Sequence, residues 1–401
     1  MLNQADNEAL TRVGRGTPAG ELLRRYWHPV AMAAELSEAK PTKVVTLLAE
    51  KLVLFRLPPD VGQTKPQYGL MAEQCPHRLA SLSFGRVDEK GIRCPYHGWK
   101  YDLQGRCIEQ PAEPSDSTYK NEIVQPAYPV QIMAGLLFAY LGPLPAPLLP
   151  RWDVLVREDG KRRVFVESTI NCNWLQPMEN SVDPAHFYWL HGVAFGSGAG
   201  YMNMNRSFAE KSSFIRFEHG IIKRRLMQAE NPQDPPLIDE HPLVFPSALR
   251  NVTPDRSGIY LDANGKKAVR HDMQIRVPVD DTHTMVFVVE FIPTPAENSP
   301  PDQEYPYEYV SLKDADGKYL FNLIHAQDAM AWETQGSITD RSKEHLGASD
   351  IGVMMLRKLV KEQIEVVRKG GDPLGVIRDP AKNQLIDFGV INERIGVFRA
   401  S

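Results

Sequence analysis

The chain has 401 residues, which is enough for two or three domains with sizeable cores. Apolar residues make up 42% and charged residues 24%, as in an ordinary soluble globular protein. The net charge of −4 gives no basic footprint for nucleic acid, and no run of about twenty apolar residues predicts a membrane span. Because the N-terminal segment also lacks the features of a secretory signal, we expect a soluble, cytoplasmic protein.

The first part of the chain is predicted to be a short helix followed by a β domain. Residues 20–27 have the pattern of an amphipathic helix. Short runs rich in β-branched and aliphatic residues, separated by Pro and Gly, predict antiparallel strands at 44–48, 52–57, 68–72 and 135–141. We place this domain, including its N-terminal helix, at residues 1–142.

Two short segments within this domain supply two Cys–His pairs. One residue separates Cys75 from His77, and after sixteen intervening residues Cys94 and His97 follow, separated by two. A 2Fe–2S cluster can take two thiolates on one iron and two neutral imidazoles on the other. The pattern therefore predicts a cluster with Cys75 and Cys94 on one iron and His77 and His97 on the second, at a raised reduction potential.

A structural zinc ion is the alternative for the same four residues, because zinc also accepts two Cys and two His. Zinc sites more often pair Cys-x-x-Cys with His-x-x-x-His, whereas each half of this motif mixes one Cys with one His. The pattern thus favours the iron–sulfur cluster. The two remaining cysteines, Cys107 and Cys172, are predicted to be buried free thiols.

The segments CPHR at 75–78 and CPYHGWKYD at 94–102 resemble the cluster loops of Rieske non-heme iron oxygenases. The segments 14–18 and 24–30 are similar to the start of the phthalate-dioxygenase-like branch, which is related to the aryl-ether O-demethylases. The resemblance implies an α+β fold class. An N-terminal all-β Rieske domain would be followed by a catalytic domain of helix-grip type, with an antiparallel sheet flanked by helices.

A proline-rich connector is predicted to join the two domains. Residues 143–150 carry four prolines, which fix φ and remove hydrogen-bond donors. Beyond this linker, residues 151–401 are expected to form the second domain, with strands at 163–167 and 285–292 and helices at 317–335 and 351–369. Strands in one run with helices around them again indicate an α+β domain.

A second metal site is indicated by Asp183, His186 and His191, which lie within nine residues. Two His and one carboxylate are a common ligand set for non-heme iron and leave coordination positions open. His191 lies five residues after His186, so it would share that face only if the helix ended near Gly192 or contained a π-bulge. By the family resemblance, His186 and His191 are iron ligands and Asp183 is a bridging carboxylate.

The third ligand of this mononuclear iron is expected to be Asp328. This acid stands among small and apolar residues, where an unpaired charge would be costly, and the segment 327–333 resembles the family's C-terminal ligand helix. Glu333 and Asp340 are the alternatives, and His325 is a candidate to hydrogen-bond the carboxylate of Asp328.

The resemblance implies a terminal oxygenase that carries a 2Fe–2S Rieske cluster and a mononuclear Fe(II). Electrons would come from an NADH-dependent reductase, directly or through a ferredoxin, and O2 would react with an aromatic substrate bearing carboxyl or methoxy groups. The family's head-to-tail trimers or hexamers would let Asp183 connect His97 of one copy with His186 of its neighbour.

Several alternatives remain open from the sequence. Hydroxylation and O-demethylation use the same ligands, and the chain could also be a Rieske electron carrier with a binding domain that is not catalytic. Three arginines, Arg206, Arg216 and Arg250, are candidates to hold a substrate carboxylate, and each could equally be an ordinary surface residue.

Overall fold

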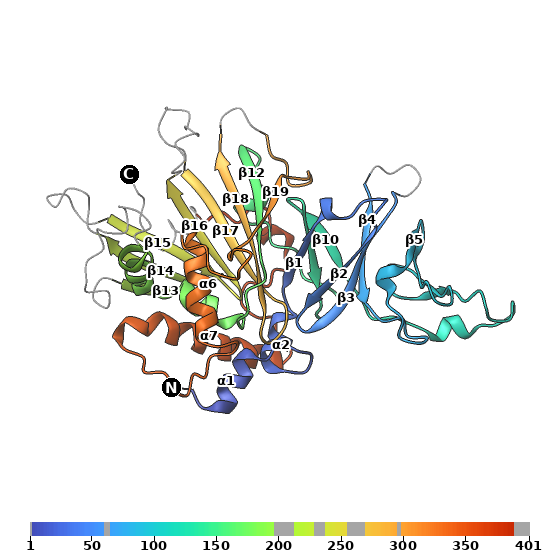
Figure 1. Cartoon of the computed structure of the whole chain (residues 1–401), viewed down its shortest axis with the longest axis horizontal. Coiled ribbons are helices and arrows are strands. Elements are labelled where there is room, and N and C mark those ends of the chain that lie inside the picture. The colour runs from blue at the N-terminus through green and yellow to red at the C-terminus, as the bar shows by residue number, and fades with distance from the viewer. Residues whose placement is uncertain are drawn as a thin grey trace. The chain divides into compact units, whose positions relative to one another are not determined.

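The computed structural model describes residues 2–59, 65–195, 212–227, 237–254, 269–294 and 298–388. The chain divides into two compact units (Figure 1). The first consists of Arg24–Ala146 with Asp302–Glu304, and the second of Met1–Leu23, Pro147–Pro301 and Tyr305–Ser401. The division between Ala146 and Pro147 falls inside the proline-rich run.

Residues 1–23 differ from the expected domain assignment, because they belong to the second unit. Helices α1 (Gln4–Thr11) and α2 (Pro18–Leu23) pack against α7 (Ile351–Arg368). Backbone carbonyls at the end of α1 accept hydrogen bonds from the side chains of Asn173 and Trp174. The predicted helix at 20–27 is therefore only partly right, since α2 ends at Leu23 and a strand begins at Trp27.

The first unit is an all-β domain, as the sequence predicts. Its described residues form three small sheets, in the orders β1-β11-β10, β2-β3-β4-β9 and β5-β6-β7-β8. The strands are β1 (Trp27–Met32), β2 (Thr42–Leu47), β3 (Glu50–Leu57), β4 (Gln67–Ala72), β5 (Arg86–Asp88), β6 (Gly91–Arg93), β7 (Lys100–Tyr101), β8 (Cys107–Glu109), β9 (Ala127–Tyr128), β10 (Val130–Met133) and β11 (Leu136–Tyr140). Short 3₁₀ turns at Ala33–Glu35, Leu82–Phe84 and Tyr119–Glu122 connect them.

The second unit is built on one large sheet, for which eight strands are described. In spatial order they are β13 (Ser212–Phe217), β14 (Gly220–Met227), β15 (Leu237–Val244), β16 (Ala248–Pro254), β17 (Val269–Pro278), β18 (Thr284–Pro293), β12 (Gly160–Glu167) and β19 (Tyr307–Val310). All neighbouring pairs are antiparallel except β12 and β19. The α+β class with an antiparallel-dominated sheet is thus confirmed.

Helices cover one face of this sheet and present the candidate metal ligands. Helix α6 (Ile324–Thr334) runs across the strands in Figure 1 and packs through Ala326, Ala329 and Trp332 on Val286 and Val288 of β18. The described residues also form α3 (Asp153–Val156), α4 (Leu175–Ser181), a π-helix (Phe187–Ala194) and α7, with 3₁₀ turns at Ala348–Asp350 and Pro380–Lys382. Helix α6 begins seven residues later than predicted (317 against 324), because residues 312–320 form turns and a β-bridge instead.

The structure also bears on the two remaining cysteines and on membrane-spanning helices. Cys107 and Cys172 are buried free thiols, as expected. None of the described helices is long and apolar enough to cross a membrane.

Candidate functional site

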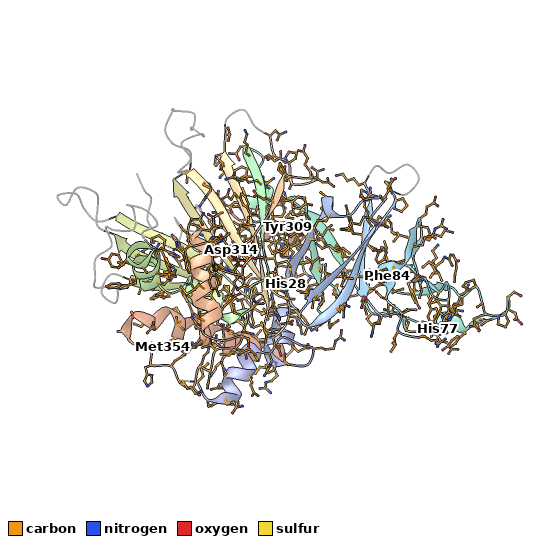
Figure 2. The ribbon with its side chains drawn as sticks, in the orientation of Figure 1. His28, His77, Phe84, Tyr309, Asp314 and Met354 are labelled. Carbon is orange, nitrogen blue, oxygen red and sulfur yellow. The ribbon has the colours of Figure 1, made fainter. Side chains whose placement is uncertain are left out.

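The two Cys–His pairs lie on two tight loops of the first unit. The amide of Cys75 donates to Ala80, and the amide of Leu79 donates back to Cys75. The second loop joins β6 to β7, where the amide of Cys94 donates to Trp99. Each loop is therefore closed by backbone hydrogen bonds around a buried cysteine. Figure 2 shows His77 at the end of the unit that carries β5 to β8.

The four side chains converge from these loops. The rings of His77 and His97 meet edge to face with their centroids 4.6 Å apart. Trp99 stacks on His77 at 4.4 Å and fixes the plane of that ring. Cys75 and Cys94 are buried in the same core cluster, and the hydroxyl of Tyr101 lies 3.2 Å from Sγ of Cys75. The two thiols and two imidazoles of the motif therefore lie on neighbouring loops of one core cluster.

The electrostatics of the loops suit an iron–sulfur cluster. Burial lowers the pKa of His97, and the nearby charge of His77 lowers it further. A lowered pKa favours the neutral ring that a metal ligand must present. Burial raises the pKa of the Cys75 thiol, a cost that binding of a metal cation would offset. Nδ1 of His77 is buried and has no hydrogen-bond partner among the described residues. A buried imidazole nitrogen without a hydrogen-bond partner is consistent with a role as a metal ligand.

The second group of candidate ligands begins at the end of α4. Helix α4 ends at Ser181, Pro184 follows Asp183, and the chain then winds into the π-helix Phe187–Ala194. A π-helix widens each turn, which turns His191 toward the face of His186. The distortion that the spacing of the two histidines requires is therefore present.

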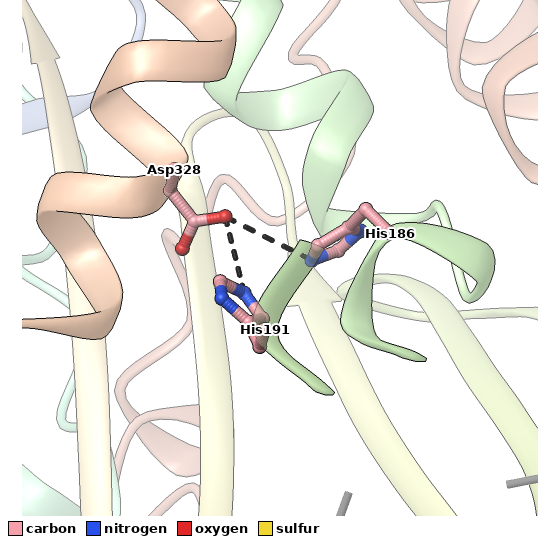
Figure 3. Close-up of side chains that lie close together, drawn as sticks. All are labelled: His186, His191 and Asp328. Carbon is pink, nitrogen blue, oxygen red and sulfur yellow. Dashed lines mark ion pairs between the residues drawn. The ribbon is translucent and has the colours of Figure 1, made fainter. Parts of the chain in front are cut away.

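Three side chains meet at this point (Figure 3). His186, His191 and Asp328 each offer one ligand atom, and these atoms all lie within 4.8 Å of one another. Oδ1 of Asp328 lies 3.3 Å from Nε2 of His191 and 3.9 Å from Nε2 of His186. The three come from the π-helix region and from α6, two segments far apart in the sequence. Among the described residues, these three side chains form the group of His, Cys, Asp or Glu residues that is close enough together to hold one metal ion.

The other ring nitrogen of each histidine faces a polar group. Nδ1 of His191 lies 2.7 Å from Oε1 of Gln327. Nδ1 of His186 lies 3.5 Å from Oδ2 of Asp183, an ion-pair contact without a hydrogen bond. Burial raises the pKa of Asp183, but its contacts with His186 and the amide of Ala185 outweigh that effect and bring the pKa to about 2. Asp183 is thus an anion that orients one imidazole.

The two alternatives for the third ligand have other partners. Glu333 contacts Lys313 and Tyr319 and accepts from Asn171. Asp340 lies on the surface, where it caps a turn through Ser342 and pairs with Lys343. Neither belongs to the group around His186, so the geometry favours Asp328.

The other sequence candidates lie elsewhere. His325 was a candidate to hydrogen-bond Asp328, but its Nδ1 contacts Oε1 of Glu167 on β12 instead, because α6 turns that ring toward the sheet. Arg216 forms an exposed ion pair with Glu362 at 2.7 Å. Arg250 is buried against Asp153 at 2.6 Å and is therefore part of the core. Arg206 lies outside the described residues.

Three neighbours of the metal group were missed by the sequence analysis. Gln327 contacts His191, the amide of Asn180 donates to Oδ1 of Asp328 at 3.4 Å, and Nζ of Lys223 donates to the carbonyl of Asp183 at 3.3 Å. Gln327 and Asn180 could have been found from their place in the two motifs, next to Asp328 and three residues before Asp183. Lys223 comes from β14 and carries no such signal.

Two family models and several characterised proteins match this chain. The family described as Rieske [2Fe-2S] domain matches residues 26–129, and the family described as LigXa C-terminal domain like matches residues 315–400. The chain is 37% identical to the 5,5′-dehydrodivanillate O-demethylase oxygenase subunit of Sphingobium sp. over 98% of its length and 87% of the relative. It is 34% identical to phenoxybenzoate dioxygenase subunit alpha of Ectopseudomonas oleovorans, over 92% of its length and 87% of the relative.

Solved structures share the fold at lower sequence identity. NdmA of Pseudomonas putida CBB5 superposes with a TM-score of 0.62 at 24% identity, over 88% of this chain and 93% of that one. Dicamba monooxygenase bound to dicamba gives the same TM-score at 16% identity, over 87% of this chain and 99% of that one. These likenesses concern the whole two-domain architecture.

Proposed function

The chain belongs to the oxygenase subunits of the Rieske non-heme iron oxygenases, and from that premise we propose that it oxygenates an aromatic compound bearing carboxyl or methoxy groups. As a member of this family it is an oxidoreductase with a 2Fe–2S cluster and a mononuclear iron. The observation that carries the proposal is the buried group of His186, His191 and Asp328 in the same chain as the cluster loops.

We assign the ligands residue by residue. Cys75, Cys94, His77 and His97 would hold the cluster, and the mononuclear iron would be held by His186, His191 and Asp328. When bound, the iron supplies O2 activation, because three protein ligands leave positions open for oxygen and substrate. The chain itself contributes the orientation of both imidazoles, through Asp183 and Gln327.

Relatives of this family work with a reductase and form oligomers. We propose that an NADH-dependent reductase, directly or through a ferredoxin, reduces the cluster, and that the chain assembles as a trimer or hexamer. The residues around the cluster loops support such docking, since Leu79 is 64% exposed and Tyr96 is 56% exposed beside the two histidines. Asp183 would then link His97 of one copy to His186 of the next.

O-demethylation is the form of the reaction that we favour. The relative with 37% identity carries that activity in its name, whereas dioxygenases match at 34% and 29%. An electron carrier with a binding domain that is not catalytic would have no need for two histidines and a carboxylate in one buried group. Removal of a methyl group and hydroxylation of a ring differ in their products, which an experiment can separate.

The test is an oxygen-uptake screen with the cluster- and iron-loaded protein and a surrogate reductase. The panel holds 3-methoxybenzoate, vanillate and 5,5′-dehydrodivanillate, each paired with its methyl ester. We expect uptake above background with at least one acid, together with formaldehyde and the corresponding phenol. Ring-hydroxylated products without formaldehyde would replace O-demethylation by hydroxylation, and no uptake with any member would refute the aromatic proposal.

A further inference from the structure

Arg276 is a buried guanidinium on the wall of the sheet that faces the proposed iron site. It pairs with Val286 across β17 and β18, and Gln274 pairs with Val288. Residues directly opposite one another in an antiparallel pair point to the same face of the sheet. Val286 and Val288 pack against α6, the helix that carries Asp328, so Arg276 and Gln274 point toward the same side.

The hydrogen bonds of Arg276 leave much of its guanidinium unused. Nη1 donates to the backbone carbonyl of Gln274 at 3.3 Å, and Nη2 donates to Oε1 of the same residue at 2.8 Å. Nε is buried and has no partner among the described residues. An arginine carries five N–H donors in a rigid fork. With only 2% of the residue exposed, bulk water does not satisfy the others.

The positive charge of Arg276 also lacks a contacting carboxylate. In the described part of the chain, no acid lies within ion-pair range of its guanidinium, whereas buried Arg250 contacts Asp153 and buried Arg341 contacts Glu179. Burial lowers the pKa of Arg276 to about 10, and three more distant acids only partly oppose that effect. Arg276 thus differs from Arg250 and Arg341, which each pair with a buried carboxylate, and from buried Arg162, whose guanidinium donates to three backbone carbonyls.

The acids nearest to Arg276 are already compensated by other groups. Glu167 contacts His325. Asp272 accepts from Asn251 at 3.0 Å and lies 3.6 Å from Arg270. Asp328 belongs to the proposed iron site. A buried cation without its own counter-charge is costly, so its retention indicates a partner that arrives from outside the chain.

We infer that Arg276, oriented by Gln274, binds the carboxylate of the substrate in the oxygenase site. This inference rests on the proposed function and narrows it to aromatic acids. A planar carboxylate can accept two parallel N–H bonds from a guanidinium. Val286 and Val288 on the same face are covered by Ala326, Ala329 and Trp332 of α6, so the apolar neighbours of Arg276 belong to the packed core. A buried cation in such surroundings selects a ligand with one anionic substituent at that end.

The test compares acid and ester binding in matched variants. Dissociation constants are measured by calorimetry for the three acid and ester pairs, with cluster- and iron-loaded protein. The variants are Arg276→Met, which removes the charge, Arg276→Lys, which keeps the charge without the fork, and Arg216→Met as an exposed arginine control. We expect wild type and Arg216→Met to bind the acid tighter than its ester by on the order of 10- to 100-fold.

In Arg276→Met the acid should bind no better than the ester, while the ester keeps its wild-type affinity. Arg276→Lys should retain part of the preference, and it serves as the second variant if the methionine protein does not fold. An acid preference that survives in Arg276→Met, or equal binding of acid and ester by wild type, overturns the inference while oxygen uptake can still support the proposed function. Failure of wild type to bind any member of the panel overturns both.

Discussion

Nδ1 of His191 donates a hydrogen bond to Oε1 of Gln327 across 2.7 Å, and this contact sets the tautomer of the imidazole. The amide of Gln327 cannot turn freely, because its Nε2 donates to the carbonyl of Phe321 at 2.6 Å. Oε1 is therefore the acceptor, Nδ1 carries a proton, and Nε2 is the nitrogen that faces Asp328. Gln327 prepares His191 to bind a metal before the metal arrives.

Replacing Gln327 should thus weaken iron binding according to the chemistry of the new side chain. Gln327→Leu removes the acceptor, and we expect the affinity for Fe(II) to fall about 10- to 100-fold. Gln327→Glu keeps an acceptor at the same place and should retain most of the affinity. Competition with a chelator on cluster-intact protein measures both. Equal iron affinity in the leucine and wild-type proteins would contradict this role.

The proposed iron ligands can be separated from the nearby acids by substitution. His186→Ala, His191→Ala or Asp328→Ala should each lose about one iron per chain and abolish oxygen uptake, because removal of one of three ligands leaves too few donors. The cluster spectrum should not change. Glu333→Gln is the matched control, since Glu333 contacts Lys313 and Tyr319 instead. The iron content of each variant is measured by metal analysis. Loss of iron in Glu333→Gln, with normal iron content in Asp328→Ala, would make Glu333 the third ligand in place of Asp328.

Replacing a proposed cluster ligand should remove the 2Fe–2S cluster. His77→Ala or His97→Ala should remove the brown-red colour and the reducible 2Fe–2S signal, because each takes one of two imidazoles from the same iron. Cys107→Ser provides the control, as this thiol packs in the same core cluster and its Sγ contacts the carbonyl of Glu109. We expect its spectrum to match wild type. A colourless wild-type protein containing only zinc would refute the cluster.

The candidate metal ligands could be predicted from local sequence motifs. Contacts between residues far apart in the chain could be seen only in the structure. Cys75, His77, Cys94 and His97 lie in two short loops, so sequence spacing was enough to group them. The five-residue spacing of His186 and His191 predicted either a helix end near Gly192 or a π-bulge, and the structure has a π-helix there. In contrast, the partner of His325 lies on β12 and the face of Arg276 depends on the register of β17 with β18. Such relations link residues far apart in the chain, and no local pattern encodes them.

The N-terminal helices illustrate the same limit. The amphipathic pattern of residues 20–27 predicts a helix with a buried face, but it does not say which domain covers that face. In the structure, side chains of Asn173 and Trp174 bind the backbone at the end of α1 and place it in the second unit. The sequence order of the elements therefore gave the wrong neighbour for residues 1–23.

The ion pair between His325 and Glu167 should make stability depend on pH. Burial alone lowers the pKa of His325, but Glu167 outweighs that effect and raises it to about 9. Because the pKa in the folded state lies above the unfolded value of about 6.5, the pair stabilises the protein fully below pH 6.5, and the gain is lost as pH rises through 9. Allowing for the partly exposed ring, this contribution is about 2 kcal/mol.

His325→Gln should therefore lower the free energy of unfolding more at pH 6 than at pH 10. Urea denaturation of the metal-free protein at both pH values measures the difference. His345→Gln, at an exposed position, should show no such dependence. A loss in His325→Gln that is the same at both pH values would mean that the ring contributes by packing and not by its charge.

The route of electrons between the two metal centres is tested through Asp183. Its pKa of about 2 makes it an anion throughout the working range of pH, and it orients His186. Asp183→Asn keeps an acceptor oxygen for that ring but removes the charge. We expect normal iron content and a normal cluster spectrum, with product formation slowed at least tenfold because the link to His97 of a neighbouring copy is weakened.

Mixed oligomers show whether that link crosses between copies. A chain with His97→Ala has no working cluster, and a chain with His186→Ala has no working iron site. Assembled together, they place one intact cluster beside one intact iron site at some of the contacts between copies, and part of the activity should return. Mixtures of two chains with the same substitution serve as the control. If verified mixed oligomers stay inactive, electrons pass within a single chain, and Asp183 acts only by orienting His186.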